Sequence, residues 1–243
     1  MVCKIIAHRG FSSRYPENTL LAFKKAVEFG CDGIELDVHL TRDQEVVICH
    51  DESIDRTSNG HGLIKDLTLA QLKQYRFDKG YDSKDPFELV DIQIPTLSEL
   101  LEWLKTKNLE VNIEIKNNIF SYPGIVEKVL NLVTTYGVED RTIISSFNHY
   151  TIQEVKKQMR NMKCGFLTET TQLDPGRYCY DYQVECYHPD FQTLIPQVVE
   201  SCRDHQIELN VWTVNQANQM KALAALPVHR IITNEVALAK QIL

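Results

Sequence analysis

Three carboxylate side chains stand in two short segments that are otherwise apolar. Glu35 and Asp37 belong to the run GIELDVHL, and Glu114 lies in the run NIEIK. Because side chains alternate along a β-strand, Glu35 and Asp37 are expected on the same face. Buried carboxylates need a partner, and oxygen ligands suit a hard divalent ion such as Ca²⁺ or Mg²⁺. The three together predict a metal site, although each one alone could equally pair with a neighbouring Lys or Arg.

Two histidines end apolar runs that predict strands. His8 ends VCKIIAH, and His50 ends EVVICH. Reactive groups of α/β barrels lie at the carboxyl ends of the strands, and imidazole titrates near neutrality, which suits proton transfer. His8 and His50 are therefore predicted to form an acid–base pair beside the carboxylates. His39 shares the strand face of the two paired carboxylates and is given no role.

Two basic residues are candidate phosphate ligands. Arg9 follows His8 directly, and Lys116 lies two residues beyond Glu114 on the same expected face. Arg presents a planar fork to phosphate and Lys a point charge, whereas a surface ion pair is the alternative for either residue. Trp212, in NVWTVN near the end of a late strand, is expected either to form a pocket wall or to pack in the core.

Apolar runs of strand length alternate with helical patterns along the chain. The predicted strands lie at 2–8, 33–40, 111–115, 141–145, 163–167, 183–187, 207–214 and 229–233. The helical patterns lie at 18–29, 96–106, 125–136, 149–158, 193–205 and 216–226. Strands that alternate with helices imply a parallel sheet, and this many units predict an α/β fold closed as a (β/α)8 TIM-type barrel. An open doubly wound sheet is the alternative.

One region breaks this alternation. Residues 51–95 follow EVVICH, are rich in Gly and Pro, and contain a helical patch near 67–75. A long connection inside a compact domain is usually functional or an insertion. We therefore predict a single barrel domain over residues 1–243, with a short insertion at 51–95 after the second barrel strand region, near the active face.

Composition excludes several classes of protein. The net charge of −7 argues against a nucleic-acid binder, whose affinity depends on a basic surface. The seven cysteines are scattered, odd in number and without a C-x-x-C pair, which disfavours disulfides and a thiolate zinc site and favours a cytoplasmic location. MVCKIIAHRG lacks the apolar stretch of a signal peptide, so no stable membrane anchor is expected. No oligomeric state is predicted.

Six short motifs, taken together, resemble the glycerophosphodiester phosphodiesterase family. They are HRG, PENT, ELDV with T-x-D after it, HD, IEIK and VWTVN. Each is weak alone, but their order and spacing fit the family from His8 to about Asn234. The resemblance implies a barrel with a small insertion after HD, dependence on a divalent metal ion, and small glycerophosphodiester substrates.

The resemblance also implies roles for individual residues. The catalytic pair would be His8 and His50; the metal ligands Glu35, Asp37 and Glu114; the substrate-binding residues Arg9, Lys116, Trp212 and Phe147. Glu17 and Asn18 of PENT would support the first loop, and Asn18 is also expected as a helix N-cap. The sequence departs from the family at Gln44, where glycine is common, and in the last strand, HRIITNEV, which lacks the T-D-x-P pattern.

The implied reaction releases sn-glycerol 3-phosphate and an alcohol from a glycerophosphodiester. His8 is assigned as the base and His50 as the acid. The attacking group is either the glycerol 2-hydroxyl, with a cyclic phosphate as intermediate, or a metal-bound water. The rival functions are a phospholipase D-like or cyclising lyase acting on lysophospholipids, a binding module without turnover, and an open-sheet metal phosphatase.

Overall fold

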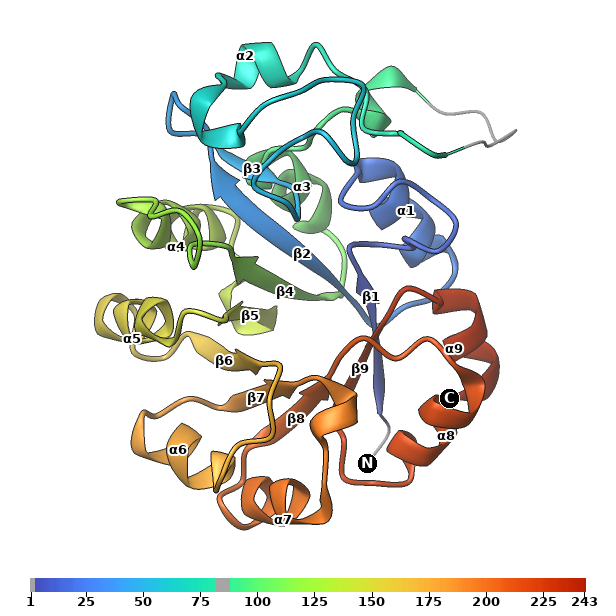
Figure 1. Ribbon diagram of the computed structural model, residues 1–243, viewed down its shortest axis with the longest axis vertical. Coiled ribbons are helices and arrows are strands. Elements are labelled where there is room, and N and C mark those ends of the chain that lie inside the picture. Colours follow the sequence, from blue (N-terminus) through green and yellow to red (C-terminus); the bar gives the residue numbers. More distant parts are fainter. Residues whose placement is uncertain (1–2, 82–87) are drawn as a thin grey trace.

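The computed structural model describes residues 3–81 and 88–243, and within them nine strands form one sheet (Figure 1). The strands are β1 (Lys4–His8), β2 (Gly33–Leu40), β3 (Val46–Ile48), β4 (Glu110–Ile115), β5 (Thr142–Ser146), β6 (Lys163–Thr168), β7 (Cys186–Pro189), β8 (Glu208–Val211) and β9 (Arg230–Thr233). Val2, the first residue of the first predicted strand, and residues 82–87 of the expected insertion lie outside the described residues.

The sheet closes on itself through β1. This strand pairs with β9 on one side and with β2 on the other, and every pairing in the ring β1-β9-β8-β7-β6-β5-β4-β2 is parallel. Strand β3 stands outside the ring and runs antiparallel to β2. The predicted (β/α)8 barrel is therefore confirmed, and the open doubly wound sheet is wrong. The register sets His8 beside Glu35 and Asp37 beside Glu114.

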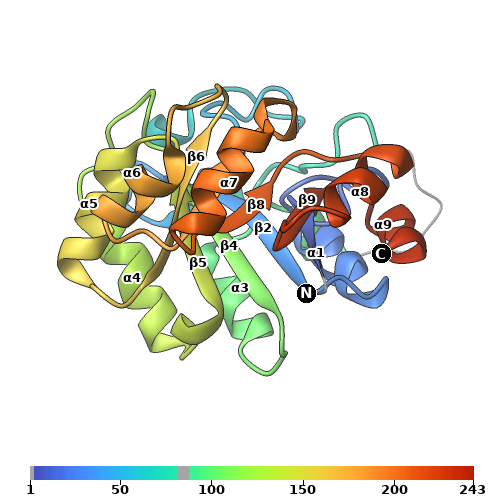
Figure 2. The same ribbon diagram turned by 90° about the horizontal axis from the view of Figure 1, so that it is seen from below.

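Helices surround the strands, as Figures 1 and 2 show from two directions. They are α1 (Leu20–Glu28), α2 (Leu69–Leu72), α3 (Leu97–Leu104), α4 (Ile125–Thr135), α5 (His149–Gln158), α6 (Pro175–Asp181), α7 (Pro196–Asp204), α8 (Ala217–Ala224) and α9 (Val236–Ile242), with 3₁₀ turns at Ile64–Asp66, Leu89–Ile92, Glu139–Arg141 and Phe191–Thr193. The sequence analysis missed α6 and α9 and made α2 too long. Both missed helices span seven residues, too short for a clear apolar period.

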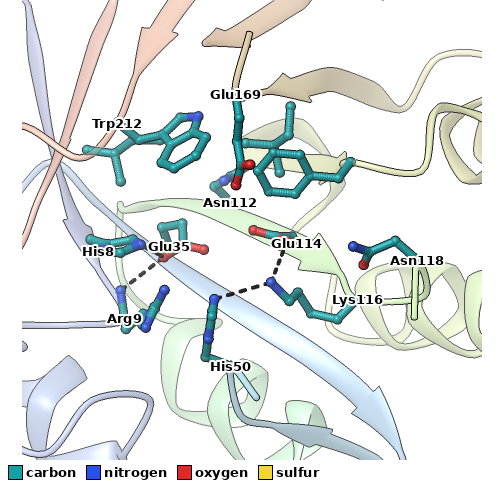
Figure 3. A pocket seen from close by; sticks show the side chains of 13 residues that line it. His8, Arg9, Glu35, His50, Asn112, Glu114, Lys116, Asn118, Glu169 and Trp212 are labelled. Atoms are coloured by element: carbon teal, nitrogen blue, oxygen red, sulfur yellow. Dashed lines mark hydrogen bonds and ion pairs between the residues drawn. The ribbon is translucent and has the colours of Figure 1, made fainter. Parts of the chain in front are cut away.

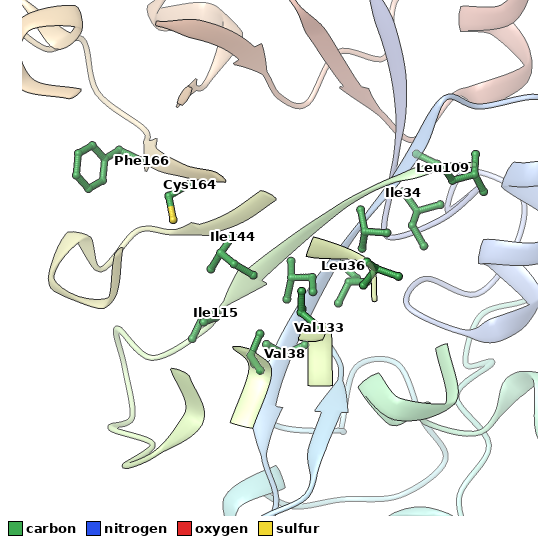
Figure 4. Packing of buried hydrophobic residues seen from close by; sticks show 14 of the residues in the cluster. Ile34, Leu36, Val38, Leu109, Ile115, Val133, Ile144, Cys164 and Phe166 are labelled. Atoms are coloured by element: carbon green, nitrogen blue, oxygen red, sulfur yellow. The ribbon is translucent and has the colours of Figure 1, made fainter. Parts of the chain in front are cut away.

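Alternating side chains divide each barrel strand into an apolar outer face and a more polar inner face. Ile34, Leu36 and Val38 of β2 belong to the main apolar core between barrel and helices, which Figure 4 shows in part. Their neighbours Glu35 and Asp37 have the opposite parity and are also buried. The outer face thus stabilises the barrel while the inner face is free to carry charged groups.

The segment after β3 has a small apolar cluster of its own. Six of its buried members lie in or next to this segment, and Val47 belongs to β3: the seven are Val47, Cys49, Ile54, Ile64, Leu72, Phe77 and Ile94. Within the described part, Ser53 and Leu63 form an antiparallel bridge, and Ile64 N–H donates to the Glu52 carbonyl. Packing and backbone pairing therefore hold the first part of this segment against β3.

A ring of charges closes the end of the barrel at which the strands begin. Its members are each the first residue of a strand: Lys4, Glu110, Lys163, Glu208 and Arg230. Arg230 pairs with Glu110 at 2.6 Å and also with Glu208. Glu208 accepts in turn from Lys163 at 2.7 Å, and Glu110 from Lys4 at 2.5 Å. This network lies at the opposite end of the strands from the predicted catalytic residues.

We expect Glu208→Gln to remove the part of the free energy of unfolding that the wild type loses on acidification. Burial raises the pKa of Glu208, but hydrogen bonds from Lys163 and Arg230 outweigh burial and lower this pKa to about 2. A carboxyl group whose folded pKa lies below its unfolded value stabilises the fold above the unfolded pKa, and that contribution is lost as the pH falls toward the folded pKa. For Glu208 the contribution is at most about 3 kcal/mol, lost between about pH 5 and pH 2.

Urea unfolding of both proteins across this pH range measures the effect. The variant should have a smaller free energy of unfolding at pH 7 and a shallower loss of that free energy on acidification. Identical pH dependence in the variant and the wild type would contradict the assignment.

Candidate active site

A cavity of about 270 Å³ opens at the carboxyl ends of the barrel strands (Figure 3). Its lining includes most of the predicted site residues: His8, Arg9, Glu35, His50, Glu114, Lys116, Phe147 and Trp212. The remaining lining residues are Asn112, Asn118, Leu167, Glu169 and Ile232. Asp37 is not part of the cavity wall but lies against it, 1% exposed, beside Glu114 in the sheet. The structure thus brings all nine predicted residues into one place.

Three buried carboxylates form an acidic cluster at this cavity. One oxygen each of Glu35, Asp37 and Glu114 lies within 4.8 Å of the other two. Burial raises the pKa of Glu35 well above its usual value, and the charges of Asp37 and Glu114 raise it further. Burial and the Asp37 charge likewise raise the pKa of Glu114 to about 7. Such mutual repulsion is what a cation placed among the three oxygens would offset.

Asp37 remains the most acidic member of the cluster because of its neighbours. Burial alone would raise its pKa, but Arg9 and Lys116 outweigh burial and lower this pKa to about 2. Arg9 Nε lies 3.5 Å from Asp37 Oδ2, and Lys116 Nζ lies 3.7 Å from Asp37 Oδ1. Asn18 Nδ2 donates to Asp37 Oδ2 at 2.9 Å. One hydrogen bond and two neighbouring cations therefore hold this carboxylate and keep it ionised.

The role expected for Asn18 as a helix N-cap is wrong. Thr19 caps α1, since its hydroxyl accepts from Ala22 N–H at 3.2 Å. Asn18 instead has a left-handed backbone, with φ of 57°, and its buried side chain points at Asp37. Asn tolerates this backbone conformation better than most residues. PENT therefore places the cap one residue later and uses Asn18 to hold a carboxylate of the acidic cluster.

The donor set fits a hard divalent cation. Glu35, Asp37 and Glu114 offer carboxylate oxygens from neighbouring strands. The amide oxygen of Asn112, two residues before Glu114 in β4, is buried and has no hydrogen-bond partner among the described residues. Carboxylate and amide oxygens are the ligands that Mg²⁺ and Ca²⁺ prefer. No cysteine or histidine joins the cluster, so a softer metal has no matching ligand there.

The turn after β1 brings His8 and the Arg9 backbone to the cluster. Arg9 and Gly10 both have left-handed backbones, with φ of 56° and 81°. A Cβ at position 10 would lie 2.7 Å from the backbone of Ala22, so only glycine fits. This turn directs the Arg9 N–H to Glu35 Oε2 at 3.0 Å. The motif HRG is thus explained by geometry: the glycine lets the chain fold back so that its neighbours face Glu35.

His8 is held in one orientation by an amide. Its Nδ1 lies 2.7 Å from Asn234 Oδ1, which can only accept, so Nδ1 carries the proton. Nε2 then faces the acidic cluster, 3.9 Å from Glu35 Oε2. Burial and the nearby Arg9 charge lower the pKa of His8 to about 4. A neutral imidazole with a bare Nε2 is the form that accepts a proton.

His50 reaches the same cavity by a different route from the one expected. Strand β3 is not a barrel strand; it runs back along β2, and Cys49 N–H donates to the Asp37 carbonyl. Asp51 accepts from His50 Nδ1 at 2.6 Å, which leaves Nε2 facing Lys116 Nζ at 3.3 Å. His39 lies beneath, with Nε2 against the His50 carbonyl at 3.2 Å, and is buried away from the cavity.

Two cations and two aromatic rings line the cavity, and Figure 3 shows Trp212 across from Arg9 and His50. Lys116 Nζ lies 3.0 Å from Glu114 Oε1 and over the Phe147 ring, 6.0 Å from its centroid. Trp212 meets Phe147 edge to face, with ring centroids 5.6 Å apart. The indole N–H donates to the His188 carbonyl at 2.9 Å, so the ring is fixed. The cavity wall therefore combines two cations with an apolar surface.

Sequence reasoning missed several residues that build the site. Asn234 orients His8, and Asn112 and Glu169 line the cavity. Asn112 shares the strand parity of Glu114, so alternation alone could have found it. Asn234 and Glu169 directly follow the barrel strands β9 and β6, which is the position where barrel enzymes carry functional groups. None of the three belongs to one of the six family motifs, and Asn112 and Asn234 were given no role although the runs NIEIK and HRIITNEV contain them.

Comparison with known proteins gives consistent results. The Glycerophosphoryl diester phosphodiesterase family matches residues 8–238. A glycerophosphodiester phosphodiesterase of Caldanaerobacter subterraneus subsp. tengcongensis is 42% identical over 231 residues, covering 95% of this chain and 93% of the relative. One of Bacillus altitudinis is 38% identical over 234 residues, covering 95% and 94%. A solved structure is that of an Oleispira antarctica phosphodiesterase in complex with the product sn-glycerol-3-phosphate. Its TM-score is 0.87 at 24% identity, and the match covers 99% of this chain and 96% of that chain, so the two share the barrel fold.

We expect divalent ions to stabilise the protein through the acidic cluster. A ligand that binds only the folded state at about 100 times its Kd adds about 3 kcal/mol to the free energy of unfolding. Mg²⁺ or Ca²⁺ should therefore raise the unfolding temperature of the wild type and have little effect on Glu35→Gln, Asp37→Asn or Glu114→Gln. Glu169→Gln, a cavity carboxylate outside the cluster, is the matched control and should keep the response. A full response in all three cluster variants would exclude this metal site.

Proposed function

The chain belongs to the glycerophosphoryl diester phosphodiesterase family, and we propose that it hydrolyses glycerophosphodiesters to sn-glycerol 3-phosphate and an alcohol with the help of one divalent cation. The observation that carries this proposal is the arrangement of two histidines. His8 and His50 both direct Nε2 into one cavity, and three buried carboxylates lie between them. Cleavage of a phosphodiester needs this combination of a proton acceptor, a proton donor and a site for a cation.

The acidic cluster would hold the cation. Glu35, Asp37 and Glu114 supply its protein ligands, and Ca²⁺ and Mg²⁺ both fit these oxygens. When bound, such an ion offsets the negative charge that develops on the phosphoryl group in the transition state. Arg9 and Asn18 contact Asp37 Oδ2 and so orient this carboxylate for the ion.

The cavity would bind the two halves of the substrate's glycerol phosphate. Arg9 and Lys116 lie on the side of the acidic cluster, where they can pair with phosphoryl oxygens. Trp212 and Phe147 add an apolar surface to the same cavity, which suits the carbon backbone of glycerol. The alcohol group would then extend toward solvent, so that glycerophosphodiesters with different alcohols are accepted.

We assign the base to His8 and the acid to His50. Asn234 gives His8 a neutral acceptor, and burial lowers the pKa of His8 to about 4, so His8 starts neutral and takes the proton of the attacking hydroxyl. Asp51 accepts from His50 Nδ1 and leaves Nε2 toward the cavity, where His50 would protonate the leaving alcohol. The attacking hydroxyl is the substrate's own glycerol 2-hydroxyl or a water, and detection of a cyclic phosphate distinguishes the two.

The wider setting of this function follows from other features of the chain. We place the enzyme in the cytoplasm as a single barrel domain, with residues 51–95 as an insertion, acting on a small molecule and not on nucleic acid. All seven cysteines are buried thiols and none is paired in a disulfide, which suits a reducing compartment. Within the described residues, no helix combines the length and the apolar character needed to cross a membrane.

We expect glycerophosphocholine to be hydrolysed and the reaction to stop when divalent ions are removed. Released sn-glycerol 3-phosphate is measured by a coupled assay, before and after EDTA treatment and after Mg²⁺ or Ca²⁺ is restored. Full turnover after exhaustive chelation would disprove the metal requirement. Turnover of lysophosphatidylcholine with glycerophosphocholine inert would instead favour the lysophospholipase D-like alternative.

We expect His8→Ala and His50→Ala each to lower kcat by about 10²–10⁴-fold, because each removes one proton transfer. The double variant should lose little more than the worse single variant, since both groups serve one transition state. Ion-induced stabilisation should persist in both single variants, because neither histidine is a metal ligand. Near-normal turnover of His50→Ala would remove its role as the acid.

A further inference from the structure

Arg56 connects two loops that carry groups of the candidate active site. It lies six residues after His50, is half exposed, and was given no role by the sequence. Its guanidinium contacts Asp51, the partner of His50, and Glu17, the partner of Arg9. One cation therefore lies between the loop after β3 and the loop after β1.

Both carboxylates receive two hydrogen bonds from this one side chain. Arg56 Nε and Nη2 donate to the two oxygens of Asp51 at 2.7 and 3.1 Å. Nη1 and Nη2 donate to the two oxygens of Glu17 at 2.9 and 2.7 Å. A planar guanidinium that binds two carboxylates in this forked way fixes their angle as well as their distance, which an ammonium group cannot do.

Each of these two carboxylates also accepts a hydrogen bond from a residue that lines the cavity. Asp51 Oδ1 accepts from His50 Nδ1 at 2.6 Å, and Glu17 Oε1 accepts from Arg9 Nη1 at 3.0 Å. Through Arg9 the chain of contacts continues to Asp37. His50 and Arg9 belong to segments far apart in the sequence, and these contacts join them through Arg56.

The backbone around Arg56 is well suited to hold it. Ile54 and Ser58, two residues to either side, are fully buried. Ser58 donates from both N–H and Oγ to the Ile54 carbonyl, and the Ile54 N–H donates to Gly62. Arg56 is therefore presented from a closed turn that packs against β3, not from a free loop.

We propose that Arg56 is a positioning residue, which aligns His50 for proton transfer through Asp51 and Arg9 for phosphate binding through Glu17. The assignment rests on the function proposed above. Four hydrogen bonds from one guanidinium fix the geometry of the two groups behind Asp51 and Glu17. Forked and networked pairs are also the surface pairs that can add to stability, so the unfolding temperature of an Arg56 variant separates the two effects.

The first test compares turnover of glycerophosphocholine by the wild type, Arg56→Gln and Arg56→Lys. Loss of a residue that orients a functional side chain typically costs about 10–100-fold, so Arg56→Gln should lose kcat by this factor and raise KM. Lysine restores the charge but not the fork, so Arg56→Lys should recover only part of the loss. Arg177→Gln is the control, because Arg177 also pairs with a carboxylate at the surface, through its Nε and both oxygens of Asp181 on α6, but within the described residues contacts none that line the cavity; its kcat and KM should be those of the wild type.

A double-mutant cycle shows through which partner Arg56 acts. If it orients His50 through Asp51, Arg56→Gln should lower kcat little further in an Asp51→Asn background, and its remaining effect should be on KM. The unfolding temperature of Arg56→Gln should equal that of the wild type. A lower kcat at unchanged unfolding temperature then shows a positioning role and not a folding role. The assignment would be overturned if Arg56→Gln kept the kcat and KM of the wild type. It would also be overturned if the fold-loss of kcat in the double variant equalled the product of the losses in Arg56→Gln and Asp51→Asn.

A second readout does not depend on activity. The Nδ1 proton of His50, bound to Asp51, is followed by NMR on protein with ¹⁵N-labelled histidine and is identified by its loss in His50→Ala. Arg56→Gln should speed its exchange with water, because Asp51 loses its anchor. Equal exchange in the variant and the wild type would contradict the proposal. If the wild type failed to hydrolyse glycerophosphocholine, the proposed function would fail, and this exchange measurement would still decide the role of Arg56.

Discussion

Three carboxylates of like charge lie within 4.8 Å of one another inside the barrel, and the rest of the site is arranged to keep them there. Such a cluster repels itself, so the fold surrounds it with donors: the Arg9 N–H on Glu35, Asn18 on Asp37, and Lys116 on Glu114. These donors arrive from the HRG turn, the PENT segment and the end of β4. The spacing of the motifs along the chain therefore follows from one electrostatic requirement in one place.

The two histidines at the cavity have different hydrogen-bond partners. The Asn234 amide holds the His8 ring, and the Asp51 carboxylate holds the His50 ring, each through Nδ1. One imidazole therefore has a neutral acceptor and the other a charged one. This difference comes from Asn234 and Asp51, neither of which lines the cavity itself.

Local patterns predicted much of this arrangement. Strand alternation put Glu35 and Asp37 on one face, and the alternation of strands and helices predicted the barrel, because both depend on neighbours in the sequence. Contacts over long separations could not be predicted in this way. Asn234 meets His8 across 226 residues, and the antiparallel course of β3 depends on pairing with β2, which the composition of EVVICH does not reveal. Asn18 was misassigned because Asn is the better N-cap residue of the adjacent Asn and Thr, and only the fold shows that Thr19 takes this position.

Strand β3 leads to His50 but takes no part in closing the barrel. Two parts of the fold thus meet at the cavity: a ring of eight parallel strands with the acidic cluster and His8, and an appended antiparallel strand followed by His50. Every pairing that closes the ring is made by the other strands. The His50 side of the cavity mouth is therefore open to evolutionary remodelling on a barrel whose closure does not depend on it.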